Sequence, residues 1–148
     1  MSMADYFFLK ESLLQVIPIA REHRVTLCLE MDLPPKWVKM VIEDFNSRVI
    51  KVAYDSGNST ALGYDVNEEF YHYGNKIKVI HVKDRLFNGP SVKFGTGHVN
   101  FTKLFHNIDL KAKEVPLTLQ PYREEQYEDD LVTLQQQVDF LKPYLTEL

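Results

Sequence analysis

Short runs of β-branched and aliphatic residues alternate with helix-like stretches along most of the chain, and this alternation limits the fold more than any other feature. Such a pattern is typical of βαβ units in a parallel sheet. The runs are nearly continuous in apolar residues, as expected of strands covered on both faces. The predicted strands are 25–29, 49–53, 77–82 and 115–119. The sequence therefore predicts an α/β fold with four parallel strands and flanking helices.

Apolar spacing and end-capping residues predict the helices. Pro34 and Pro35 stand where a missing amide donor costs little, at a helix start. Asp65 and Asn100 are expected to cap two further helices. Residues 1–8 are expected to be irregular. A last helix is predicted from one apolar seam with steps of three and four residues, made of Leu131, Leu134, Val138, Leu141 and Leu145.

Composition restricts the class of protein. With 148 residues, 45% of them hydrophobic, we expect a single domain over residues 1–148. A net charge of −4 argues against nucleic acid and anionic membranes as partners, because both need a basic face. No apolar run approaches the roughly 20 residues that span a bilayer. Cys28, expected in the core, is the one cysteine, which fits a cytoplasmic location.

Polar residues close the four apolar runs, and they recur with a similar phase. Glu30, Asp55, His81 and Gln120 follow one another at separations of 25, 26 and 39 residues. The last interval is lengthened by a glycine-containing loop at 85–99. In parallel α/β sheets the carboxyl ends of the strands form the edge where ligands bind. These side chains are therefore candidates for a common site.

Two carboxylates and an imidazole meeting at one point suit a divalent metal such as Mn²⁺, Mg²⁺, Co²⁺ or Zn²⁺. The alternative is that Glu30 and Asp55 are helix N-caps and that His81 is a hydrogen-bonded core histidine. Because all three follow apolar strands in phase, we favour the metal site.

Four segments resemble one known family. They read LCLE at 27–30, DSGN at 55–58, HVKD at 81–84 and FGTGHVNF at 94–101. Together they are similar to the xylose-isomerase-like TIM barrels, in the branch of hexulose-6-phosphate isomerase and L-ribulose-5-phosphate 3-epimerase. The resemblance extends from about Val25 to Tyr122 and corresponds to strands five to eight of the family's barrel. It implies half of a (β/α)₈ barrel.

The resemblance also implies an activity and site residues. Family members bind one divalent metal through residues at the positions of Glu30, Asp55 and His81, with a fourth ligand at the position of Gln120. They isomerise or epimerise a sugar or sugar phosphate through an enediolate, with two glutamates moving the proton, at Glu30 and at the position of Gln120. Substrate contacts are expected from Asn58, Lys83, Gly95 and Gly97.

Two departures leave the activity open. Gln120 has no basic lone pair with which to accept a proton at neutral pH, and it removes one negative charge from the metal site. Glu124 or Glu125 could supply a carboxylate if the loop folds back. The first four strands are absent, whereas a whole barrel needs about 250 residues. Because unpaired sheet edges invite pairing, we expect a homodimer that approximates a barrel, or else a second chain that supplies the other half.

Three functions follow from these observations. The first is a metal-dependent sugar (phosphate) isomerase or epimerase. The second is a catalytically impaired or inactive half-barrel remnant that binds metal or sugar weakly. The third, an apurinic endonuclease of the same fold, is disfavoured by the acidic charge and by a total of five histidines.

Overall fold

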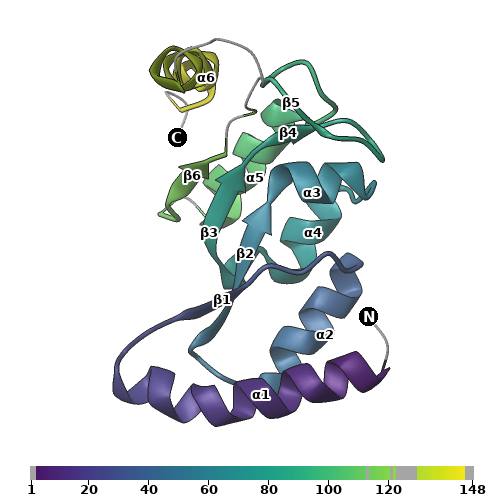
Figure 1. Ribbon diagram of the computed structural model, residues 1–148, viewed down its shortest axis with the longest axis vertical. Helices are drawn as coiled ribbons and strands as arrows, with labels where there is room; N and C mark the ends of the chain where they lie inside the picture. The colour runs from purple at the N-terminus through teal and green to yellow at the C-terminus, as the bar shows by residue number, and fades with distance from the viewer. Residues whose placement is uncertain (1–2, 113, 121, 123–129, 146–148) are drawn as a thin grey trace.

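A parallel four-stranded sheet with strand order β1-β2-β3-β6 lies at the centre of the computed structural model (Figure 1). The structure describes residues 3–112, 114–120, 122 and 130–145. A two-stranded antiparallel ladder, β4–β5, follows β3. The elements are α1 (Met3–Glu22), β1 (Leu27–Leu29), α2 (Pro35–Phe45), β2 (Ile50–Asp55), α3 (Ser56–Ala61), α4 (Val66–Tyr73), the 3₁₀ turn η1 (Gly74–Lys76), β3 (Ile77–Val82), β4 (Asp84–Arg85), β5 (Ser91–Val92), α5 (Phe101–Ala112), β6 (Leu117–Leu119) and α6 (Asp130–Leu145).

The hydrophobic core lies between one face of this sheet and the helices. Ile50, Ile80 and Val82 are fully buried there, packed in one cluster with Val41 of α2 and Leu104 of α5. Because successive strand residues point to opposite faces, alternate residues of β2, namely Ile50, Val52 and Tyr54, reach this core. The prediction of four parallel strands with flanking helices is therefore confirmed.

The other face of the sheet is more open than the sequence predicted. Leu27 and Leu29 pack against the core, whereas Cys28 between them is exposed. Thr118, which pairs in register with His81, is exposed as well. The expectation that Cys28 lies in the core is therefore wrong, because no helix covers its face of β1 in the described part of the chain.

The predicted helix ends agree with the structure. Pro34 precedes α2, whose first residue is Pro35. The Asp65 side chain accepts hydrogen bonds from two amides of the first turn of α4. Asn100 Oδ1 accepts a hydrogen bond from the Lys103 amide at the start of α5, at 2.9 Å.

Both ends of the described chain differ from expectation. The helix α1 begins at Met3, not after residue 8, and its first turns are tied to α2 because Lys10 Nζ lies 2.5 Å from Asp44 Oδ2. On α6 the predicted seam is only partly buried. Leu141 is 1% exposed, whereas Leu131 is 72% exposed.

None of the helices in the described ranges is both long enough and apolar enough to cross a membrane.

Candidate metal centre

The carboxyl ends of the first three strands bring Glu30, Asp55 and His81 together. Glu30 follows β1, Asp55 ends β2, and His81 pairs with Asp55 in the parallel register of β2 and β3. One ligand atom from each residue lies within 4.8 Å of the others. The predicted convergence of these three side chains is therefore present in the structure.

The donor set fits a divalent cation. Carboxylate oxygens and an imidazole nitrogen are the ligands that Mn²⁺ and Zn²⁺ sites use. His81 Nδ1 lies 3.1 Å from Glu30 Oε2. His81 Nδ1 is nevertheless buried and has no hydrogen-bond partner among the described residues. A buried imidazole nitrogen that has no hydrogen bond and lies beside a carboxylate is the arrangement expected at a cation site.

Asp55 also performs the task that the alternative interpretation assigned to it. Its Oδ1 accepts a hydrogen bond from the Asn58 amide at 2.7 Å and caps α3. Its Oδ2 lies 3.4 Å from Lys83 Nζ, and the Asp55 side chain is almost fully buried. Glu30 caps no helix, since the residue before α2 is Pro34. The capping interpretation thus holds for Asp55 alone, and Asp55 still has one oxygen within 4.8 Å of ligand atoms of Glu30 and His81.

Lys83 and Asn58, both predicted as substrate contacts, lie beside the cluster. Asn58 Nδ2 donates a hydrogen bond to Glu30 Oε1 at 3.1 Å. Asn58 Oδ1 accepts one from Arg85 Nη1 at 2.9 Å. The sequence analysis missed Arg85, which follows the HVKD segment directly. Contacts with substrate stay a prediction for both residues.

Gln120 follows β6 at the same edge of the sheet. Its backbone amide donates to the carbonyl oxygen of Val82 at 2.9 Å, and its side chain is half-buried. Its roles as metal ligand and proton-transfer residue stay predictions. Glu124 and Glu125, the suggested substitutes, lie outside the described residues.

The glycine loop is organised by a buried carboxylate. Asp84 Oδ2 accepts hydrogen bonds from the amides of Gly95 and Gly97, each at 2.9 Å, and Oδ1 accepts one from Val99 at 3.1 Å. Asp84 is 1% exposed. The two glycine amides are engaged by the chain itself, so their predicted contact with substrate would require this carboxylate to move.

The space beside the cluster is small. The cavity lined by Glu30, Asp55 and Asn58 measures about 10 Å³, which is the size of one water, and His81 is not among its lining residues. Sites for small molecules usually enclose about 300 Å³ or more. A substrate at this centre would therefore extend onto the open face of the sheet.

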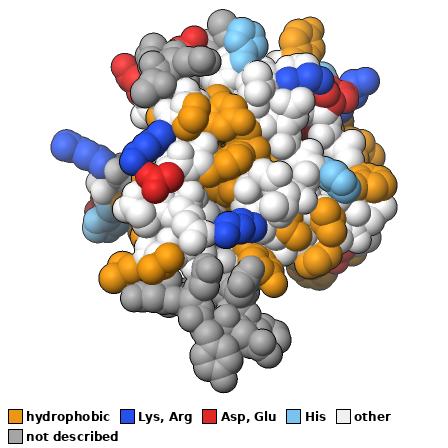
Figure 2. Space-filling view, turned by 90° about the horizontal axis from the view of Figure 1, so that it is seen from above, with side chains coloured by type: hydrophobic (Ala, Val, Ile, Leu, Met, Phe, Trp, Pro, Cys, Tyr) orange, Lys and Arg blue, Asp and Glu red, His pale blue; other side chains and the backbone are white. Residues whose placement is uncertain are grey.

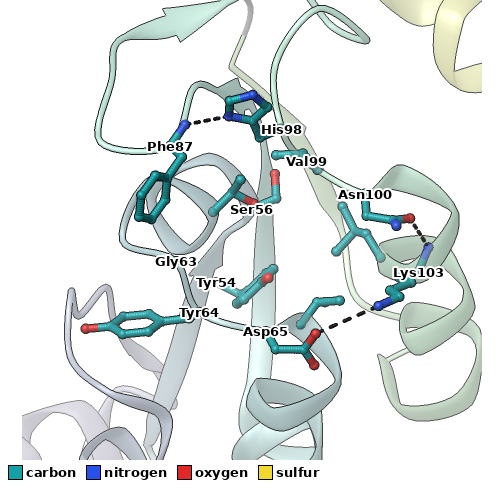
Figure 3. A pocket seen from close by; sticks show the side chains of 13 residues that line it. Tyr54, Ser56, Gly63, Tyr64, Asp65, Phe87, His98, Val99, Asn100 and Lys103 are labelled. Carbon is teal, nitrogen blue, oxygen red and sulfur yellow. Dashed lines mark hydrogen bonds and ion pairs between the residues drawn. The ribbon is translucent and has the colours of Figure 1, made fainter.

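A larger cavity of about 330 Å³ lies on the helix side of β2. Figure 3 shows it between Tyr54 and Tyr64 on one side and His98 and Lys103 on the other. His98 Nδ1 accepts a hydrogen bond from the Phe87 amide at 2.8 Å. Tyr54 lines both this cavity and the small one beside Glu30 and Asp55.

The fold and the cluster together define a parallel half-barrel with candidate metal ligands at the carboxyl ends of its strands. The family model of the xylose isomerase-like TIM barrel matches residues 5–144, and the chain belongs to this family. No curated protein matches the chain significantly.

Solved structures of the same fold are about twice as long. The xylose isomerase domain protein from Planctomyces limnophilus has 21% sequence identity and a TM-score of 0.80, over 97% of this chain and 53% of that chain. An L-ribulose 3-epimerase has 18% identity and a TM-score of 0.84, over 99% of this chain and 56% of that one. The IOLI protein, solved with a bound zinc atom, has 16% identity and a TM-score of 0.76, over 91% and 54%. The chain thus spans about half the length of these neighbours.

Proposed function

We propose that this chain is the metal-binding half of a sugar or sugar-phosphate isomerase or epimerase. Glu30, Asp55 and His81 would hold one divalent cation, with Gln120 as a weaker fourth ligand. The main support is the meeting of two carboxylates and a buried imidazole nitrogen without a hydrogen bond, with one ligand atom of each within 4.8 Å of the others. The family and the epimerase among its structural neighbours indicate the substrate class.

The chemistry needs a polarised carbonyl and a carboxylate base. A bound divalent cation would supply the first, by stabilising negative charge on the oxygens of a ketose as its enediolate forms. Glu30 is the candidate base, because its side chain is 41% exposed and so reaches the open face. Asn58 and Lys83 would orient sugar hydroxyls or a phosphate. Gln120 cannot accept the proton on the opposite face of the sugar.

The alternative proposal is an impaired or inactive half-barrel that binds metal or sugar weakly. Gln120 favours it, because one carboxylate fewer lowers both metal affinity and proton transfer. A group of three ligands in the described part of the chain supports one cation, which disfavours the multi-metal chemistry of the endonucleases. With a single exposed cysteine and an acidic net charge, we propose a cytoplasmic protein that binds neither nucleic acid nor membranes.

Metal binding by three residues is the first prediction to test. Isothermal titration with Mn²⁺ and Zn²⁺ should show one site per chain, and we expect Glu30→Gln and His81→Ala to weaken binding by at least tenfold. Glu43→Gln on α2 and His72→Ala on α4 are matched controls that should bind as the wild type does. Wild-type protein that takes up neither metal would rule out the centre.

Proton transfer separates the two functional proposals. An active isomerase should exchange solvent deuterium into a ketose or ketose phosphate in the presence of Mn²⁺, and Glu30→Gln should abolish the exchange. Metal binding without exchange into any such sugar would favour the remnant.

We further propose that two copies form a homodimer. In the described structure β1 and β6 are the sheet edges, and each has a partner strand on one side only. The neighbouring structures contain about twice the length of this chain. A second chain that supplies the other half is the alternative.

A further inference from the structure

We infer that Arg85 is a positioning residue for the candidate metal centre, acting on Glu30 through the side-chain amide of Asn58. This inference rests on the proposed metal site. The three residues come from the turn after β1, from α3 and from β4, and so connect three separate segments. The connection consists of two hydrogen bonds, Arg85 Nη1 to Asn58 Oδ1 at 2.9 Å and Asn58 Nδ2 to Glu30 Oε1 at 3.1 Å.

The chemistry of the three groups fixes the direction of these bonds. A side-chain amide can present either its oxygen or its nitrogen to a neighbour, and the two orientations differ by a flip. A guanidinium has only donors, so Arg85 must face the oxygen of Asn58. The nitrogen of Asn58 then points at Glu30, whose carboxylate can only accept. Without Arg85, the amide could turn its oxygen toward Glu30 and repel it.

Arg85 is itself held in place before it reaches Asn58. Its Nε and Nη2 donate to the carbonyl oxygen of Gly89 at 3.1 and 2.8 Å. Gly89 lies in the turn between β4 and β5, and Arg85 pairs with Ser91 across that ladder. The hydrogen bonds of Nε and Nη2 to Gly89 therefore hold the guanidinium so that Nη1 faces Asn58.

Gly57 leaves space for the side chains of Lys83 and Arg85 to pass close to α3. A Cβ atom at Gly57 would lie 2.8 Å from Cγ of Lys83 and 3.0 Å from Cγ of Arg85. These are the stems of the side chains, which have little freedom to move away. The close approach of Lys83 and Arg85 to the first turn of α3 therefore requires glycine at position 57.

These contacts fix the orientation of the Glu30 carboxylate at the candidate metal centre. Asn58 engages Oε1 of Glu30, and Oε2 stays 3.1 Å from His81 Nδ1. Outer residues that orient ligands typically change metal affinity by about 10- to 100-fold when they are removed. Arg85→Gln should therefore weaken Mn²⁺ binding by at least about tenfold without removing a ligand.

The test is a double-mutant cycle with Mn²⁺ titration of the full chain. We expect Arg85→Gln and Asn58→Ala each to weaken binding, and the double variant to be no weaker than Asn58→Ala alone, because both act through one amide. Arg48→Gln, which changes an exposed arginine before β2, is the matched control and should leave the affinity unchanged. We call the two hydrogen bonds from Arg85 through Asn58 to Glu30 the relay. If the losses in Mn²⁺ binding free energy of the two single variants add in the double variant, Arg85 does not act through Asn58 and the relay is overturned. If Arg85→Gln does not fold, an unchanged affinity in Asn58→Ala would overturn it as well.

A second measurement needs no metal. In ¹⁵N spectra of the metal-free protein, the Asn58 side-chain amide signals should shift in Arg85→Gln and in Glu30→Gln, but not in Arg48→Gln. If the wild type binds no Mn²⁺ and these shifts are present, the metal proposal fails and the relay stands as a structural contact. Unchanged amide signals in Arg85→Gln would refute the relay whatever the metal result.

Discussion

The two oxygens of the Asp55 carboxylate serve different partners. Oδ1 caps α3 through the Asn58 amide, and Oδ2 lies 3.4 Å from Lys83 Nζ. Capping and metal binding are alternative interpretations of one residue, and the structure is compatible with both, because one oxygen of Asp55 lies within 4.8 Å of ligand atoms of Glu30 and His81. The sequence predicted Asp55, Glu30 and His81 because each follows an apolar run. It could not predict Arg85, because that side chain acts through Asn58, 27 residues away.

Glu69 carries a buried carboxylate and lies outside the metal-ligand cluster. It is 1% exposed and accepts hydrogen bonds from the hydroxyls of Tyr54, Ser59 and Tyr73. Burial raises the pKa of Glu69 above its usual 4.5, and the three hydroxyl donors offset part of that rise. The same burial raises the pKa of Tyr54, where the nearby Glu69 adds to the effect.

The raised pKa of Glu69 predicts how stability changes with pH. The folded state holds the proton more tightly than the unfolded state, so its contribution to the free energy of unfolding grows as pH falls through the folded pKa toward 4.5. Wild type should therefore gain stability relative to Glu69→Gln as the pH is lowered from 8 toward 5. Urea unfolding of both proteins at the two pH values measures this difference. A difference that is constant with pH, or that falls on acidification, would contradict it.

At the scale of elements, apolar runs and caps predicted most of the fold, whereas contacts distant in sequence set the rest. Helix α3 has the sequence SGNSTA, which carries no apolar stripe. It forms because Asp55 caps it and because Ser56 Oγ bonds the backbone of Lys83, donating to its carbonyl at 2.7 Å and accepting from its amide at 3.0 Å. The sequence pattern did not predict the start of α1 either, because a contact distant in sequence stabilises it, between Lys10 and Asp44 of α2.

The loop at 85–99 depends on Asp84, and its removal is predicted to be costly. Asp84→Asn replaces one acceptor oxygen by a donor that faces backbone amides, leaving buried donors without partners. We expect a loss of about 3 kcal/mol in the free energy of unfolding. Gly97→Ala should be similarly damaging, because its Cβ would lie 2.8 Å from the Arg85 carbonyl oxygen and closer still to Asp84.

Chemical denaturation of these two loop variants tests the role of Asp84. The exposed Asp32→Asn is the matched control and should change stability by less than about 0.5 kcal/mol. Wild-type stability in Asp84→Asn would show that the loop does not depend on this carboxylate.

At the scale of the whole molecule, the half-barrel exposes large apolar side chains on its first and last helices. Phe8 of α1, the first helix, is 68% exposed, and Leu131 of α6, the last helix, is 72% exposed. Figure 2 shows hydrophobic side chains gathered over the middle of one face of the molecule. Contiguous apolar surface of this kind usually marks a site of association. The cavity beside Glu30 and Asp55 measures only about 10 Å³, so a substrate-sized site there would need further walls.

The proposed homodimer makes a direct prediction about mass. Light scattering coupled to size-exclusion chromatography should give about twice the chain mass of 17.3 kDa. Phe8→Glu and Leu131→Glu place a charge on apolar surface that the dimer would bury, so we expect both variants to shift toward monomer while their helical content is kept. Tyr71→Glu, on the outer side of α4 and 82% exposed, is the control that should stay dimeric. A stable wild-type monomer would refute the homodimer and leave a second chain as the source of the missing half. A dimer unaffected by either glutamate would mean that the copies meet through other surfaces than these two helices.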